Sequence, residues 1–158
     1  MREIPLTKGY VAHVDDCDYV RLSAYKWYAS VRKHIVYAVR SQRIHGTTKV
    51  QTVHMHRIIL DAPTGMHVDH IDHNGLHNVR SNLRLCTSSQ NAHNRRTCNK
   101  NTSGVKGVSF EVGVGKWRAI IQCKGKVYIV GYFPTKEEAA QAVRKKRQEL
   151  HGEYGCDM

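Results

Sequence analysis

The sequence is short of acidic residues and has neither a long apolar run nor a closely spaced pair of cysteines. Lys and Arg number 25 against 13 Asp and Glu, which gives a formal net charge of +12 over 158 residues. No apolar run approaches the ~18 residues that a membrane-spanning helix needs. The first residues, MREIPLTKGY, lack the apolar segment of a secretory signal. We therefore expect a soluble intracellular protein.

The cysteines are odd in number and widely spaced. No CxxC pair occurs, which argues against a structural zinc site of the ribbon or finger kind. Free thiols in a reducing compartment are the better interpretation. The cysteines are Cys17, Cys86, Cys98, Cys123 and Cys156.

The excess of positive charge predicts a polyanionic partner, and nucleic acid is the simplest candidate. A soluble protein that is basic without such a partner is the alternative, and net charge alone does not separate the two. Basic clusters that lie between the motifs described below favour nucleic acid. A chain of 158 residues accommodates one ordinary domain or two small ones.

The stretch from Met66 to Arg96 combines a predicted order of elements with reactive side chains. Val68 to Ile71 is typical of a short strand, and Asn74-Gly75 is a strong tight-turn signal. Leu83 to Cys86 is typical of a second strand. Thr87 to Gln90 has the spacing of a capping box, so a helix is predicted to begin there. The predicted order is strand, loop, strand, helix.

Asp69 and His70 fall on the first of these strands, and Asn91 falls in the first turn of the helix. Phosphodiester hydrolysis needs a base to deprotonate water and positive charge on the developing phosphorane. His70 suits the base because imidazole titrates near neutral pH. The Asp69 side chain points to the other face of the strand, so it is a better metal ligand than partner of His70. With the Asn91 carbonyl oxygen it forms an oxygen clamp that suits Mg²⁺.

The words VDHID, SNLRL and SSQN, with their spacing, resemble the HNH nuclease motif of the ββα-metal fold. The resemblance is to the HNH homing endonucleases of phages and mobile introns, and the three letters fall on His70, Asn82 and Asn91. It implies that Asp69 and Asn91 bind one divalent ion, Mg²⁺ or a substitute such as Mn²⁺. It also implies that His70 is the general base and Asn82 braces the loop. The implied products carry a 5′-phosphate and a 3′-hydroxyl, formed in the cytoplasm of a host cell.

Basic residues surround this stretch, and no acidic residue occurs between Val79 and Lys100. We expect them to clamp the DNA backbone, which positions a duplex without reading its sequence. Arg57, in the word MHR before the motif, is a further candidate for a phosphate contact. The predicted clamp residues are Arg80, Arg84, Arg95, Arg96 and Lys100.

The first 60 residues are predicted to be β-rich. A short helix is expected over Asp18 to Ala29, and a hairpin from the strands His34 to Arg40 and Thr48 to Met55. Because so small a fragment buries little surface, we expect it to pack against the HNH unit. The aromatic residues Trp27, Tyr28 and Tyr37 are interpreted as core rather than as stacking platforms for bases.

Extra histidines lie near the motif. His54 and His56 alternate along the predicted strand and so share a face. They are candidate metal ligands or simply satisfied or exposed histidines. His73 stands where HNH relatives often have Gly, and His93 follows Asn91 closely. Either could touch substrate or a softer metal, with surface and loop positions as the alternative.

The last third follows a polar linker at 98–103 and changes pattern. Strands are predicted at Gly104 to Phe110, Lys116 to Cys123 and Lys126 to Val130. Thr135 is predicted to cap a helix that Gly152 ends. One face of this helix carries Ala139, Val143 and Leu150.

The words GVKGVSF, GKWRAIIQ, GKVYIVGYF and TKEEAAQAV resemble the DNA-binding domain of the plant ethylene-response factors, a module also appended to phage HNH endonucleases. In that family a three-stranded sheet enters the major groove. The resemblance makes Lys106, Arg118, Gln122 and Lys124 candidate DNA contacts. Ile120, Val127 and Ile129 depart from the polar or aromatic residues usual at the outward positions of this sheet, so docking on protein stays open.

The sequence therefore predicts an α+β protein. A β-rich region with the HNH unit occupies 1–97, with the HNH core at about 60–97, and the DNA-binding module occupies 104–152. The predicted function is a metal-dependent DNA endonuclease acting on double-stranded DNA, and the alternative is a non-cleaving DNA-binding regulator with a decayed nuclease. A monomer would most simply nick, whereas a homodimer could cut both strands.

Overall fold

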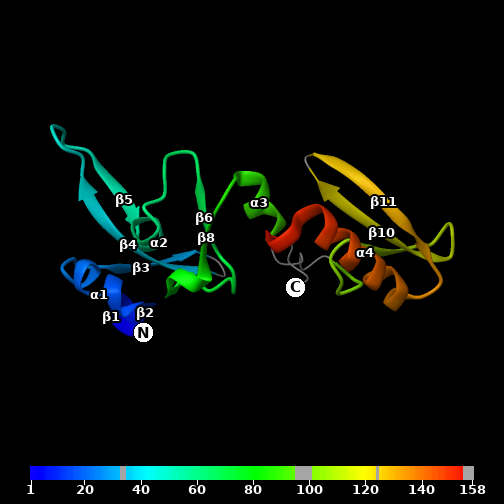
Figure 1. The fold of residues 1–158 in the computed structure, drawn as a ribbon, viewed down its shortest axis with the longest axis horizontal. Coiled ribbons are helices and arrows are strands. Elements are labelled where there is room, and N and C mark those ends of the chain that lie inside the picture. The colour runs from blue at the N-terminus through cyan, green and yellow to red at the C-terminus, as the bar shows by residue number, and fades with distance from the viewer. Residues whose placement is uncertain (33–34, 95–100, 124, 155–158) are drawn as a thin grey trace. The chain divides into compact units, whose positions relative to one another are not determined.

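The computed structural model describes residues 1–32, 35–94, 101–123 and 125–154, apart from the side chains of His93 and Glu153 (Figure 1). The predicted α+β class is confirmed, with small sheets and four α-helices in the described residues. The chain divides into two compact units, Met1–Ser88 and Ser89–Met158. No helix in the described part is long and apolar enough to cross a membrane. Of the cysteines, Cys17, Cys86 and Cys123 are free, and Cys98 and Cys156 lie outside the described residues.

A three-stranded sheet joins the N-terminus to the HNH stretch. Strands β1 (Arg2–Pro5) and β2 (Val11–Val14) pair antiparallel, with a 3-10 turn at Thr7–Gly9 between them. Strand β7 (His77–Asn78) pairs parallel with β2, so that a segment far along the chain completes the sheet. Helix α1 (Asp16–Ser23) follows β2.

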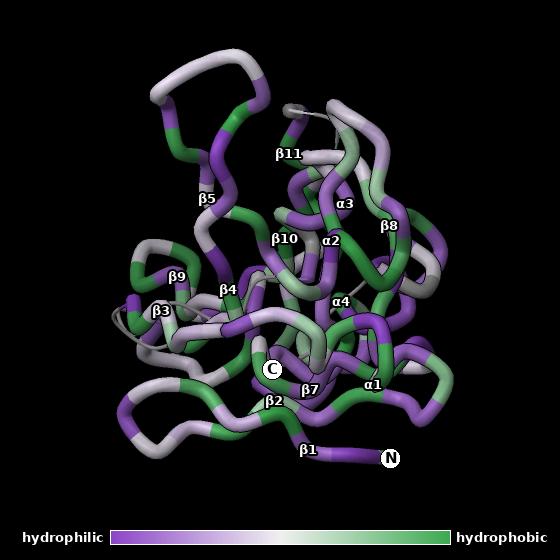
Figure 2. The backbone as a smooth tube through the Cα atoms, turned by 90° about the vertical axis from the view of Figure 1, so that its left-hand side faces the viewer, coloured by the Kyte–Doolittle hydropathy of each residue, from purple (hydrophilic) through white to green (hydrophobic). Residues whose placement is uncertain are grey.

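A second sheet has the strand order β3-β4-β5. Strands β4 (Ile35–Arg43) and β5 (Val50–His54) form the predicted hairpin, whose tip extends away from the rest of its unit and is mainly hydrophilic or neutral (Figure 2). Strand β3 (Tyr28–Arg32) was not predicted. The helix expected over 18–29 ends earlier, at Ser23.

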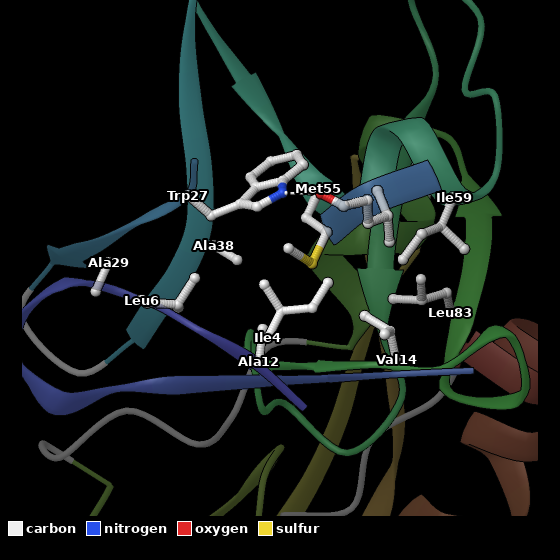
Figure 3. Close-up of a cluster of buried hydrophobic side chains, with 11 residues drawn as sticks. Ile4, Leu6, Ala12, Val14, Trp27, Ala29, Ala38, Met55, Ile59 and Leu83 are labelled. Atoms are coloured by element: carbon white, nitrogen blue, oxygen red, sulfur yellow. Dashed lines mark hydrogen bonds between the residues drawn. The ribbon is translucent and has the colours of Figure 1, made fainter. Parts of the chain in front are cut away.

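The early end of α1 has a packing cause. The Trp27 indole Nε1 donates a hydrogen bond of 2.8 Å to Leu22 O, within the buried core (Figure 3). A carbonyl at a helix end needs such a partner, and the bond turns the chain into β3. Trp27 is confirmed as a core residue, whereas Tyr28 and Tyr37 are only partly buried.

One hydrophobic core serves both the N-terminal region and the HNH stretch. Leu83 from the HNH stretch packs in the same cluster as Val14 and Met55, all nearly fully buried (Figure 3). This shared cluster confirms that the N-terminal fragment packs against the HNH unit. Helix α2 (Met55–Ile59) contributes Met55 and Ile59 to the cluster.

The predicted HNH strands are present. Strands β6 (His67–His70) and β8 (Leu83–Cys86) pair antiparallel, and a 3-10 turn at Arg80–Asn82 leads into β8. Helix α3 (Ser88–His93) begins where the capping box predicted. By the division of the chain, almost all of α3 belongs to the second unit.

The second unit contains the predicted three strands and helix. Strands β9 (Val108–Glu111), β10 (Lys116–Cys123) and β11 (Lys126–Phe133) have the order β11-β10-β9 and pair antiparallel. Helix α4 (Lys136–His151) begins at the predicted cap, where Thr135 Oγ1 accepts from Glu138 N at 3.2 Å. A short 3-10 turn at Gly152–Tyr154 follows.

The sheet of the second unit buries the face that alternation predicted. Ala119 and Ile121 are buried and pack with Ala139 and Val143 of α4, while Leu150 packs at the edge of this cluster. Every second residue of β10 therefore points away from the helix.

Candidate active site

The β6–β8 ladder sets the surroundings of Asp69. In the antiparallel register Asp69 lies opposite Arg84, and His70 lies opposite Leu83. The Arg84 guanidinium donates to Asp69 Oδ2 from Nε at 3.0 Å and from Nη2 at 2.8 Å. Asp69 is 7 % exposed, so this pair is largely removed from water and strongly bound.

The His70 imidazole lies between an amide and two aromatic rings. Its Nε2 is 3.3 Å from Asn78 Oδ1. The rings of Tyr37 and His56 pack against it, with centroid distances of 5.9 Å and 5.0 Å. The whole His70 residue is 6 % exposed, so contacts with neighbouring side chains, rather than solvent, set the orientation of its ring.

Burial governs the protonation of His70. It lowers the pKa of His70 below its ordinary value, and the hydrogen bond with Asn78 and the charges of Asp72 and Asp69 oppose the shift without cancelling it. His70 is therefore neutral near pH 7. In this state an imidazole can accept a proton.

The sequence predicted that His54 and His56 lie on one strand, and this prediction is wrong. His54 ends β5, and His56 lies on α2, because the chain turns helical at Met55. Their rings still pack together, with centroids 5.1 Å apart, and the buried Nδ1 atoms of both have no hydrogen-bond partner among the described residues. Burial, aided by His70, His54 and Arg57, lowers the pKa of His56 to about 2.

The loop between β6 and β8 is closed by side-chain hydrogen bonds. Asn82 Nδ2 donates to Asp72 Oδ1 and to His77 O, both at 2.8 Å, and Asn82 Oδ1 accepts from Asp72 N at 3.1 Å. Asp72 Oδ2 lies 2.7 Å from His77 Nδ1. His73 adopts a left-handed conformation with φ 63°, which explains why glycine suits this position in the resembling sequences.

Asn91 lies on α3, in the second unit, whereas Asp69 and His70 lie in the first. Its predicted pairing with Asp69 stays a prediction, as do the roles suggested for His73 and His93. Among the described residues no cluster of three or more His, Cys, Asp or Glu could hold a metal ion. The predicted metal site differs from such a cluster, because it consists of one carboxylate oxygen from Asp69 and one amide oxygen from Asn91.

Several predicted backbone clamps have structural tasks. Arg57 donates to three carbonyls of the turn after α2, Ala62 O, Pro63 O and Met66 O, at 2.7–3.1 Å. Arg80 forks onto Asp18 with bonds of 2.8 and 2.9 Å.

Arg84 is held by Asp69 and its side chain is only 12 % exposed; its role as a phosphate clamp stays a prediction. The sequence does not show the pairing of Arg84 with Asp69, because the two residues are neighbours across the strand ladder and not along the chain. Arg95, Arg96, Lys100 and Lys124 lie outside the described residues.

The predicted DNA contacts of the second unit have mixed surroundings. Arg118 and Gln122 are on the sheet face opposite α4, Gln122 is exposed, and Arg118 pairs with Glu111 at 3.0 Å. Lys106 is partly buried, and its carbonyl accepts a bond from Arg147.

Comparison with known proteins gives the family. A family model described as HNH endonuclease matches residues 53–93. The chain is 33% identical over 152 residues to "Uncharacterized HNH endonuclease L560" of Acanthamoeba polyphaga mimivirus, an alignment that covers 94% of this chain and 75% of that protein. It is 35% identical over 94 residues to "Protein 3.8" of Escherichia phage T7, covering 58% of this chain and 75% of the relative. No solved structure matches the chain.

The strand pair with its Asp-His dipeptide and the matches to viral relatives point to the same family. The chain belongs to the HNH endonuclease family, whose members are nucleases that act on DNA.

Proposed function

We propose that this protein is a metal-dependent, homing-type DNA endonuclease that hydrolyses phosphodiester bonds to 5′-phosphate and 3′-hydroxyl ends. The observation that carries the proposal is the neutral, buried His70 next to the Asp69 carboxylate at the end of β6, in a chain of the HNH family. A fixed neutral imidazole beside an anionic oxygen ligand is the equipment that metal-assisted hydrolysis requires.

His70 is the general base in this proposal. It takes the proton of the attacking water, and its lowered pKa supports this role because the neutral form predominates at pH 7. The rings of Tyr37 and His56 pack against the His70 ring and against each other, which reduces the reorganisation needed before proton transfer.

Asp69 and the Asn91 side-chain carbonyl are the proposed ligands of one Mg²⁺. A carboxylate and an amide oxygen are hard donors of the type that Mg²⁺ accepts, with water and phosphate filling the remaining positions. Arg84 orients the Asp69 carboxylate through bonds that both fall on Oδ2, as partners of ligating carboxylates do. When bound, the ion supplies positive charge to the phosphate and the leaving oxygen.

Asn82 has a bracing role. Its three side-chain bonds tie Asp72 and His77 together at the two sides of the loop that follows His70. Asn suits such loop bonds because its amide both donates and accepts. Removing it should loosen the loop rather than remove a reacting group.

The second unit is proposed to be an ethylene-response-factor-like DNA-binding module. Support comes from its sheet face opposite α4, where Arg118 and Gln122 could reach guanine and adenine edges. Val127 and Ile129 are 60% and 62% exposed, and apolar side chains can meet thymine methyl groups. The same apolar residues would also serve a protein partner, so both outcomes enter the test.

Cleavage of supercoiled plasmid tests the nuclease proposal. We expect nicked or linear product with Mg²⁺, none with EDTA, and a loss of at least about 100-fold in rate for His70→Ala, in line with removal of a general base. His45→Ala, at the exposed hairpin tip, is the matched control and should cleave normally. Nicked product alone would indicate one active site per event, and linear product a dimer.

DNA binding without cleavage in Mg²⁺, Mn²⁺ or Ni²⁺ would overturn the nuclease proposal and favour a regulator with a decayed nuclease. Cleavage that survives His70→Ala would show that another group is the base.

The module is tested by Gln122→Ala in the full chain. We expect weaker discrimination among duplex sequences, by about 1–3 kcal/mol at one base position. Gln141→Ala, exposed on α4, is the control. Unchanged discrimination, together with self-association that Val127→Lys abolishes, would identify the sheet as a protein-docking face instead.

A further inference from the structure

Asn78 is the most deeply buried polar side chain next to the proposed base. It lies on β7 and is 1 % exposed. Its Oδ1 is 3.3 Å from His70 Nε2, and its Nδ2 is 3.4 Å from Gly75 O. No role is predicted for Asn78 from the sequence, because it lies between the motif positions His70 and Asn82 without being one of them.

The two bonds of Asn78 fix each other's direction. A backbone carbonyl can only accept, so the Asn78 group that faces Gly75 O must be the NH₂. The amide oxygen then faces His70, and an amide oxygen also only accepts. The partner atom, His70 Nε2, must therefore carry a hydrogen. The hydrogen-bond network thus sets both the orientation of the Asn78 amide and the tautomer of His70.

We propose that Asn78 is a positioning residue that holds His70 in the tautomer with its proton on Nε2, so that Nδ1 is the nitrogen that takes the proton from water. The proposal deepens the nuclease function and rests on it for its catalytic consequence. The proton of the attacking water moves to Nδ1 while Nε2–H stays bonded to Asn78. The imidazolium that forms keeps the hydrogen bond to Asn78, and this bond becomes stronger because its donor is now charged.

The N-terminal sheet holds Asn78 in place. β7 pairs parallel with β2 in the register Val14 with Asn78, and Val14 is fully buried. His13 N also donates to Leu76 O at 2.9 Å. The orientation of the base therefore depends on a strand from the first residues of the chain, which links the N-terminal region to catalysis through β7.

The other partner of Asn78 is equally restrained. Gly75 packs so closely on β4 that a Cβ at this position would lie 2.4 Å from Val36 O and 2.7 Å from the Tyr37 ring. The Gly75 carbonyl that fixes the Asn78 amide is thus held against the same strand that carries Tyr37, a ring neighbour of His70. Both ends of the Asn78 amide are anchored by packing.

Two variants separate positioning from simple packing. Asn78→Leu keeps the volume and removes the acceptor, and we expect kcat to fall by about 10- to 100-fold, the usual effect of losing a residue that orients an active-site histidine, with KM for DNA unchanged. Asn78→Asp keeps an oxygen acceptor for Nε2–H, so its kcat should recover to within about tenfold of the wild type. Gln141→Leu, an exposed amide on α4, is the matched control.

The tautomer itself is measured by ¹⁵N NMR of the full-length protein with labelled histidine, without metal or DNA, at pH 8. His70→Gln assigns the signal. We expect Nε2 to show the protonated shift and Nδ1 the unprotonated shift in the wild type, and a mixture of tautomers in Asn78→Leu. A proton on Nδ1 in the wild type would overturn the proposal.

The NMR result decides the matter even where Asn78→Leu does not fold or the wild type does not cleave. Failure of the nuclease proposal would appear as absent cleavage with the Nε2–H tautomer intact. A fold-competent Asn78→Leu with wild-type kcat would also overturn the positioning role. So would equal loss of kcat in Asn78→Leu and Asn78→Asp, because that pattern belongs to packing and not to the acceptor.

Discussion

Asp69 and Arg84 face each other across the β6–β8 ladder, and two hydrogen bonds from the Arg84 guanidinium fall on Asp69 Oδ2. The arginine and the proposed metal ligand therefore form one buried unit. The Arg84 charge, which the sequence suggested for the DNA backbone, lies 2.8 Å from this carboxylate. The consequences for stability and for DNA binding differ and can be measured.

Arg84→Met should lower the free energy of unfolding by about 3–5 kcal/mol, because Asp69 keeps its buried charge and loses this partner. The double variant Asp69→Asn, Arg84→Met should recover part of that loss. Urea unfolding of the wild type, of Asp69→Asn and Arg84→Met singly, and of the double variant measures the coupling. A phosphate clamp predicts the reverse pattern: unchanged stability, and a salt slope of DNA binding reduced by about 1.

Asp18 should contribute acid-sensitive stability. Burial raises its pKa, but the bonds and charges of Arg80 and Arg21 outweigh burial, so the pKa of Asp18 is lowered overall. A carboxyl with a lowered folded-state pKa stabilises above its unfolded value, about 3.9, and loses this contribution as pH falls below it. Unfolding midpoints in urea from pH 6 to pH 2.5 should fall less steeply in Asp18→Asn than in the wild type. Parallel curves would contradict the assignment. Asp16→Asn, exposed on the same helix, is the control.

The buried histidines should make the protein less stable on mild acidification. Burial lowers the pKa of His54, His56 and His70, that of His56 to about 2. Below pH ~6.5 the unfolded chain binds protons that the folded protein does not, so stability is fully present above this value and falls as pH decreases. His56 alone should cost about 1 kcal/mol between pH 7 and pH 5.5.

His56→Phe tests this expectation, since it keeps an aromatic ring and removes the titrating group. The loss of stability between pH 7 and pH 5.5, measured by urea unfolding, should be smaller by about 1 kcal/mol than in the wild type. His45→Phe, at the exposed hairpin tip, should leave the pH dependence unchanged. A wild-type slope in His56→Phe would mean that His56 is not the source.

Local signals explain which elements could be predicted. The Thr135 cap of α4, the strands β6 and β8 and the β4–β5 hairpin are confirmed, because each depends on residues within a few positions of one another. The same locality explains the errors at α1 and α2. At α1, the contact of Trp27 with Leu22 in the core is not visible in the local sequence. At α2, the spacing of His54 and His56 fits both a strand and the start of a helix, and only tertiary packing selects the helix.

The surroundings of the site depend on pairings that sequence order does not display. Along the chain no acidic residue lies near Arg84, whereas the ladder places Asp69 opposite it. Asn78 was missed because β7 has two residues and pairs with β2, more than sixty positions earlier. A strand so short has no periodicity, and parallel pairing carries no turn signal.

Gly75 offers the sharpest test of the packing behind the proposed base. Gly75→Ala should be destabilising by about 1–3 kcal/mol, because its Cβ would lie 2.4 Å from Val36 O, a backbone atom that cannot turn aside. Cleavage should fall as well, since movement of the Gly75 carbonyl shifts the Asn78 amide. Gly113→Ala is the matched control, as a Cβ there meets nothing within 4 Å and its φ lies outside the left-handed range. Thermal unfolding and plasmid cleavage measure the two effects, and equal behaviour of the two alanine variants would show that the close contact between Gly75 and β4 does not hold in solution.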